Sequence, residues 1–126
     1  MVSLGATQVA IGALSGWGVA ALVGVPGAAE RLGVVDVGRV RQAHLDIIIM
    51  GGLVMAAGAV DGVPTWARRA AAVGAWTNPL LFLPMAFRPN ATSSPAYKVA
   101  SVASFTVTGA GWLGIAGAAR RAARCT

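Results

Sequence analysis

Long apolar runs dominate the chain, and short stretches rich in charged residues, glycine and proline separate them. Four runs, at about 5–25, 40–60, 66–87 and 95–118, each have the roughly 20 residues that a transmembrane helix needs. No stretch alternates between apolar and polar positions as a strand does, and a single helix satisfies its own backbone in lipid. The pattern predicts one all-α domain over residues 1–126, an integral membrane four-helix bundle running up and down.

The breaks between the runs carry residues that end helices. Pro26 and Gly27 follow the first run, and Asp61-Gly62-Val63-Pro64 follows the second. Gly27-Ala28-Ala29 is similar to a signal-peptide cleavage site, but no Lys or Arg precedes the first run. We therefore expect the first run to be a membrane helix and not a cleaved signal peptide.

Composition supports the membrane prediction. Of the 126 residues, 56% are apolar and only 11% are charged, which lies outside the range of ordinary soluble domains. The net charge of +6 would suggest a nucleic-acid partner for a soluble protein, but here the basic residues stand where apolar runs end. That placement predicts contact with lipid headgroups and no nucleic-acid partner.

The basic residues divide equally between the two membrane surfaces, so their number leaves the orientation open. One surface has Arg31, Arg39, Arg41, Arg88 and Lys98, and the other has Arg68, Arg69, Arg120, Arg121 and Arg124. The second set clusters at helix ends, which favours both termini in the cytoplasm.

Small residues recur along three of the predicted helices and predict close approach of helix backbones. They include Gly12, Gly16 and Ala20; Gly51, Gly52, Ala56 and Gly58; and Ala110, Gly114 and Gly117. Packing within one chain and packing between copies in a homo-oligomer both remain possible interpretations of this pattern.

Polar residues inside the spans are the candidates for chemistry, because burying them in lipid is costly. His44 is the one histidine of the chain and lies near the start of the second run, three residues after Arg41 on the same helical face. Asp46, two positions further on, points to another face. A structural hydrogen bond and a ligand role both fit His44.

The third run contains a second candidate group at Trp76-Thr77-Asn78-Pro79. Pro79 has no backbone N–H, so we expect it to kink the helix and to leave the carbonyl of Ala75 without its usual partner. Counting about 1.5 Å per residue places Asn78 and Met50 at the same depth and His44 about 9 Å higher. One cavity could then touch all three and admit a macrocycle on edge.

The residue sets that several common catalytic and binding sites require are missing from the sequence. The sequence has no Ser/His/Asp set, no Cys/His zinc spacing, no phosphate-binding glycine loop and no pair of buried carboxylates. A single histidine suits a haem whose iron takes one axial imidazole.

The second and third runs resemble a known family. His44-Leu45-Asp46 with Gly51, and Trp76 with Asn78, are similar to patterns of hydroxylaminobenzene mutase and styrene oxide isomerase, small four-helix bacterial membrane isomerases. The resemblance covers about these two helices and is specific in these few residues only.

The resemblance implies a ferric haem b with His44 as axial ligand, in a homo-oligomer, a trimer by resemblance, of the bacterial cytoplasmic membrane. The iron would act as a Lewis acid on a small hydrophobic substrate such as an aromatic epoxide or arylhydroxylamine, without redox turnover. Asn78, Met50 and Phe82 would form the catalytic wall, and Trp76 would contact the cofactor. Met50 stands where the relatives have asparagine, and Phe82 where the isomerase has tyrosine, so we expect the isomerase activity to be slow or directed to a substrate other than styrene oxide.

Arginine near the membrane surface would pair with haem propionates through its bidentate fork. Arg41 is the first candidate, with Arg39, Arg88 and Lys98 as alternatives. Two other functions stay open: a non-catalytic haem-binding or sensing protein, and a small four-helix channel or exporter. Against the channel, the first run contains no glutamate.

Overall fold

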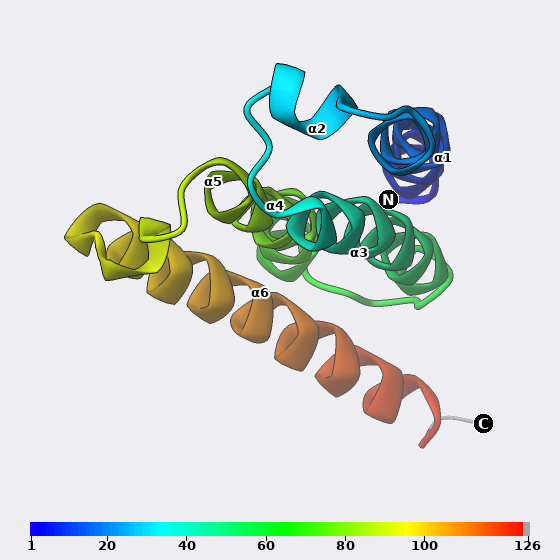
Figure 1. Cartoon of the computed structure of the whole chain (residues 1–126). Helices are drawn as coiled ribbons and strands as arrows, with labels where there is room; N and C mark the ends of the chain where they lie inside the picture. The colour runs from blue at the N-terminus through cyan, green and yellow to red at the C-terminus, as the bar shows by residue number, and fades with distance from the viewer. Residues whose placement is uncertain (125–126) are drawn as a thin grey trace.

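A computed structural model describes residues 1–124, and this part of the chain folds into helices without strands (Figure 1). Four apolar segments are long enough to cross a membrane. They are α1 (Val2–Gly24), α3 (Val37–Ala57), α4 (Thr65–Leu80) continued by α5 (Phe82–Phe87), and α6 (Pro95–Ala122). Two short elements, α2 (Ala28–Arg31) and the 3-10 turn η1 (Ala91–Ser93), lie in the connections. The predicted four-helix membrane bundle is confirmed, and the chain is a multi-pass membrane protein.

Helix ends differ from the predicted ones where local chemistry extends or stops a helix. α3 begins three residues early because the Asp36 side chain accepts a hydrogen bond from the Arg39 N–H at 3.2 Å, which caps its first turn. α6 continues past residue 118 to include Arg120 and Arg121, since cations stabilise the negative end of a helix. The third helix is interrupted at Leu81, two residues after Pro79.

The four membrane helices are arranged in a row more than in a closed ring. α1 packs chiefly against α3, α6 packs chiefly against α4, and α3 lies beside α4 and α5 (Figure 1). α1 and α6 therefore lie on opposite sides of the central pair. Large apolar side chains such as Trp17, Val99 and Leu113 are exposed on these outer helices, as expected for a lipid-facing surface.

Small residues allow the helices to approach closely within one chain. A Cβ added to Gly51 would lie 2.9 Å from the Gly5 carbonyl oxygen, and one added to Gly111 would lie 2.9 Å from the Cα of Ala71. Glycine is therefore required by backbone contact in both helix pairs. A Cβ at Gly52, in contrast, would meet open space, so not every predicted small residue serves this packing.

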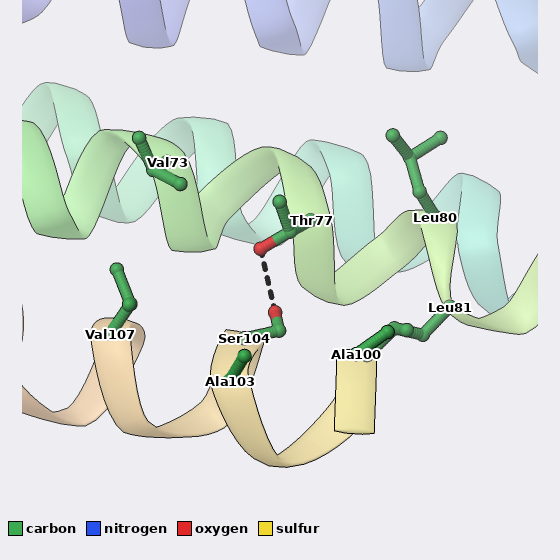
Figure 2. A pocket seen from close by; sticks show the side chains of 8 residues that line it. All are labelled: Val73, Thr77, Leu80, Leu81, Ala100, Ala103, Ser104 and Val107. Atoms are coloured by element: carbon green, nitrogen blue, oxygen red, sulfur yellow. Dashed lines mark hydrogen bonds between the residues drawn. The ribbon is translucent and has the colours of Figure 1, made fainter. Parts of the chain in front are cut away.

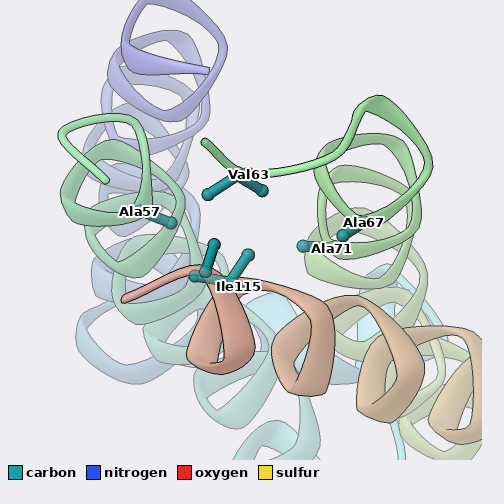
Figure 3. Close-up of a cluster of buried hydrophobic side chains, with 6 residues drawn as sticks. Ala57, Val63, Ala67, Ala71 and Ile115 are labelled. Atoms are coloured by element: carbon teal, nitrogen blue, oxygen red, sulfur yellow. The ribbon is translucent and has the colours of Figure 1, made fainter. Parts of the chain in front are cut away.

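One end of the bundle has a core of small aliphatic side chains from α3, α4, α6 and the loop after α3 (Figure 3). Its buried members are Ala57, Val63, Ala67, Ala71, Ile115 and Ala118. Alanine dominates this cluster, and its small side chain lets the backbones of α4 and α6 approach closely.

Candidate functional site

His44 lies where α3 faces α1. The Nδ1 atom of its half-buried ring is 3.0 Å from the Ser15 hydroxyl oxygen, and the same hydroxyl donates to the Gly12 carbonyl oxygen at 2.7 Å. A serine hydroxyl has one proton, and a carbonyl oxygen can only accept. With that proton directed at Gly12, the hydroxyl oxygen accepts the Nδ1–H of His44.

With the Ser15 proton on the Gly12 carbonyl, this arrangement favours the imidazole tautomer that is protonated at Nδ1. A neutral ring that is protonated at Nδ1 carries its lone pair on Nε2. Metal-binding histidines in proteins usually show this pattern, in which one ring nitrogen donates to a fixed acceptor and the other binds the metal. Ser15 therefore leaves His44 Nε2 as a base or a ligand.

Glycine in α1 makes room for the ring. A Cβ added to Gly16 would lie 3.1 Å from Cε1 of His44 and 3.6 Å from Nε2, so a side chain there would press on the imidazole. An apolar cavity of about 150 Å³ adjoins the ring. Its walls are Ser15, Val19, Val40, Ala43, His44, Ile47 and Leu83.

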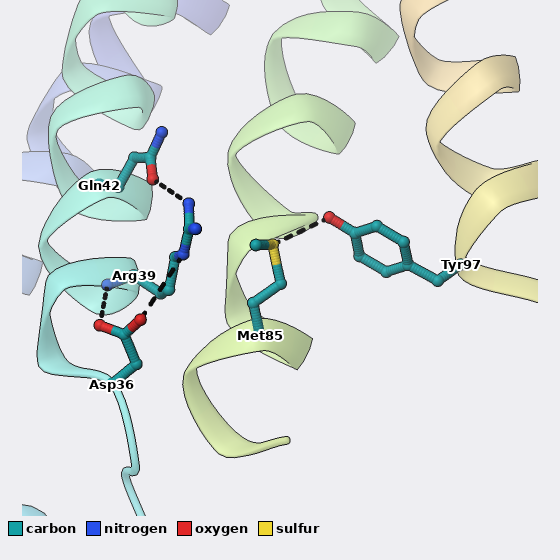
Figure 4. A network of polar contacts seen from close by, with 5 residues as sticks. All are labelled: Asp36, Arg39, Gln42, Met85 and Tyr97. Carbon is teal, nitrogen blue, oxygen red and sulfur yellow. Dashed lines mark hydrogen bonds and ion pairs between the residues drawn. The ribbon is translucent and has the colours of Figure 1, made fainter. Parts of the chain in front are cut away.

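Arg39 and Arg41, at the His44 end, differ in their polar contacts, and Figure 4 shows those of Arg39. Arg39 lies 3.7 Å from the Asp36 carboxylate through Nε and donates to the Gln42 side-chain oxygen at 2.9 Å. Arg41 is exposed, and within residues 1–124 it has no ion pair. Arg41 is thus more available than Arg39 to pair with a propionate, and the exposed Arg88 and Lys98 likewise have no ion pair within the described residues.

Asn78 is buried and is bonded to α6. Its Oδ1 accepts the Ser104 hydroxyl at 2.5 Å, and the Ser104 oxygen lies 2.6 Å from the Thr77 hydroxyl. The predicted need of this amide for a partner is met by a helix–helix contact. Its acceptor is consequently committed to α6.

The remaining predicted site residues are half-buried: Met50 on α3, Trp76 on α4 and Phe82 on α5. The cavity beside His44 is lined by other side chains. The shared cavity for His44, Met50 and Asn78 stays a prediction, as do the roles of Trp76 and Phe82.

Gln8, like Ser15 and Ser104, was not predicted from the sequence as a polar partner. Gln8 of α1 is fully buried, and its Nε2 donates to the Ala75 carbonyl oxygen at 2.5 Å. The signal was available, because Gln8 is an amide within an apolar run and the Ala75 carbonyl was expected to lack its partner. The pairing could not be predicted because Gln8 and Ala75 lie 67 positions apart in the chain.

Within the described residues, no group of three or more His, Cys, Asp and Glu side chains comes together to hold a metal ion. A haem differs, because its porphyrin supplies four ligands and the protein need supply only one.

Comparisons of the chain with known protein families, with curated proteins and with solved structures gave no match.

Proposed function

We propose that the protein is a haem-dependent isomerase of the bacterial cytoplasmic membrane that acts on a small hydrophobic epoxide or arylhydroxylamine. The observation that carries the proposal is the Ser15 contact of His44, which engages Nδ1 of the one histidine and would leave Nε2 as the ligand atom. The resemblance of the His44 and Trp76-x-Asn78 segments to the small membrane isomerases supplies the reaction class.

The residues around His44 fit a haem ligand. Ser15 orients the ring, Gly16 leaves space for it, and the aliphatic side chains of Val19, Ile47 and Leu83 line the cavity beside it. When bound, ferric haem b would supply a Lewis-acidic iron that polarises a substrate oxygen. An apolar wall strengthens such a contact because little water competes for it.

The size of the cavity makes a homo-oligomer a requirement of this proposal. Ligand and cofactor sites usually occupy roughly 300–1,000 Å³. The cavity at His44 has a volume of about 150 Å³, and the His44 ring beside it is half-buried. A haem would therefore need further walls, which a second copy of the chain, or a trimer, would provide.

Arg41 and Asn78 have distinct parts in the proposal. Arg41 is exposed at the start of α3 and would pair with a carboxylate at the membrane surface. Asn78 already accepts the Ser104 hydroxyl with its oxygen, and its N–H groups are the donors that would suit an epoxide or hydroxylamine oxygen.

An absorption spectrum of the detergent-purified protein, reconstituted with hemin, tests the cofactor. We expect a Soret band that small iron ligands shift. We also expect chromatography to show product formation from an epoxide or arylhydroxylamine, slow if the substrate is styrene oxide. A colourless protein refutes the proposal. A six-coordinate, low-spin spectrum that added ligands leave unchanged would mean that the iron has no free site, and would favour a non-catalytic haem protein over an isomerase.

A further inference from the structure

An apolar groove runs along the outer side of the α4–α6 pair (Figure 2). Its volume is about 370 Å³, within the range of small-molecule sites. Val73, Leu80 and Val107 are among its exposed aliphatic walls, and the Thr77 and Ser104 hydroxyls lie between them. The groove thus combines an apolar surface with one polar point.

The direction of the hydrogen bonds at this point is determined by Asn78. The Asn78 oxygen can only accept, so the Ser104 hydroxyl donates its single proton to it. The Ser104 oxygen must then accept the proton of the Thr77 hydroxyl, 2.6 Å away. The chain of donors runs from Thr77 through Ser104 to Asn78 and ends there.

Thr77 Oγ1 is therefore left as an acceptor. Its proton is committed to Ser104, but its lone pairs have no donor among the described residues. In a lipid-facing groove water does not compensate such an acceptor, so a ligand that donates a hydrogen bond gains by binding there. An ether, an epoxide or a hydrocarbon has no proton to offer.

We propose that the α4–α6 groove binds a small apolar molecule with a hydroxyl or amine donor, of the phenol type, which donates to Thr77 Oγ1. The site is separate from His44, since His44 faces α1 and the groove lies between α4 and α6, on the other side of the row. The inference therefore does not rest on the haem.

Fluorine NMR of the purified protein in micelles tests the proposal with 4-fluorophenol and 4-fluoroanisole, which share a ring but differ in the donor. After subtraction of partition into empty micelles, we expect 4-fluorophenol to bind about threefold to tenfold more tightly, the contribution of one neutral hydrogen bond. Equal affinities would mean a purely apolar occupant, such as a lipid chain, and would overturn the proposal.

Two substitutions at Thr77 locate the preference. Thr77→Val keeps the shape and removes the acceptor, so the preference for 4-fluorophenol should disappear while 4-fluoroanisole binds as before. Thr77→Ser keeps the hydroxyl and should retain the preference. A preference that survives in Thr77→Val, or is lost in Thr77→Ser, contradicts the assignment to Thr77 Oγ1.

Filling the groove tests its location. Ala103 is an exposed residue of the groove wall, so Ala103→Phe should abolish the binding of both probes. Leu113→Phe places the same side chain on α6 at an exposed position outside the groove wall and should leave binding unchanged. Unaltered binding in Ala103→Phe overturns the proposal. A smaller oligomer in Ala103→Phe alone, by light scattering, would assign the groove to a contact between copies instead.

Discussion

Gln8 Nε2 on α1 donates a hydrogen bond to the carbonyl oxygen of Ala75 on α4, at 2.5 Å. Pro79 lies four residues after Ala75 and has no N–H, so this carbonyl lacks its usual i+4 donor within α4. The Gln8 side chain, which is completely buried, supplies the missing donor. A polar residue in one membrane helix thereby compensates a proline in another.

Single and double substitutions of Gln8 and Pro79 should show, as a coupling energy, that Gln8 stabilises the protein through the carbonyl that Pro79 leaves without a donor. We expect Gln8→Met to lower the free energy of unfolding by about 1 kcal/mol, since it leaves the Ala75 carbonyl buried without a donor. In a Pro79→Ala background the helix itself can bond that carbonyl, and the loss should be less than half as large. Denaturation in mixed micelles of increasing SDS content, followed by circular dichroism, measures both.

Thr7→Val serves as the control for this cycle, because Thr7 is exposed on α1 and its hydroxyl bonds only the Ser3 carbonyl oxygen of the same helix. Its effect should be small and the same in both backgrounds. Equal losses for Gln8→Met with and without Pro79 would show that Gln8 does not act through Ala75.

Two glycines of α6 should respond oppositely to the same substitution. A Cβ at Gly111 would meet the backbone of Ala71, so Gly111→Ala should push α4 from α6 and lower stability by about 1–3 kcal/mol. A Cβ at Gly109 has nothing within 4 Å, so Gly109→Ala should be neutral or stabilise by up to about 1 kcal/mol. Thermal unfolding of the two variants side by side decides, and similar melting temperatures would refute the backbone contact.

If His44 ligates haem, His44→Ala should give folded but colourless protein. Ser15→Ala should keep the ligand but lose its orientation, and we expect roughly 10–100-fold weaker haem binding. Hemin titration followed at the Soret band measures both, with the exposed Ser3→Ala of the same helix as control. Full haem retention in His44→Ala would exclude His44 as the ligand.

Arg41→Gln should weaken haem binding, because Arg41 lies at the His44 end and is free of ion pairs in the described part of the chain. An exposed charged contact of this kind contributes about 1 kcal/mol or less, so the expected loss is up to about fivefold. Arg68→Gln removes an equal charge at the other membrane surface and should have no effect. A loss confined to Arg68→Gln would place the propionates at the opposite surface.

Substitution of each partner of the Asn78–Ser104 hydrogen bond distinguishes a structural role of Asn78 from a catalytic one. Asn78→Ala and Ser104→Ala should both lower stability by roughly 1 kcal/mol, since each breaks the same contact between α4 and α6. If the amide N–H groups also bind a substrate oxygen, only Asn78→Ala should lower turnover, by about tenfold or more, with the haem spectrum unchanged. Equal turnover in the two variants would restrict Asn78 to a structural role.

The sequence by itself determined the four membrane helices. Lipid offers the backbone no hydrogen bonds, so an apolar run of sufficient length must be helical whatever its neighbours are. The same local rule showed that Pro79 deprives the Ala75 carbonyl of its donor. His44 and Asn78 could be singled out because a polar side chain in an apolar run needs a partner.

Only the tertiary structure shows which residues are the hydrogen-bond partners of these polar groups. Gln8 for Ala75, Ser15 for His44 and Ser104 for Asn78 each lie on another helix, between 26 and 67 positions away in the chain. In lipid the hydrophobic effect does not select between helix faces, so pairing depends on where glycines permit backbones to touch and on which polar groups then come within reach. Those are properties of two surfaces together, and neither helix carries them alone.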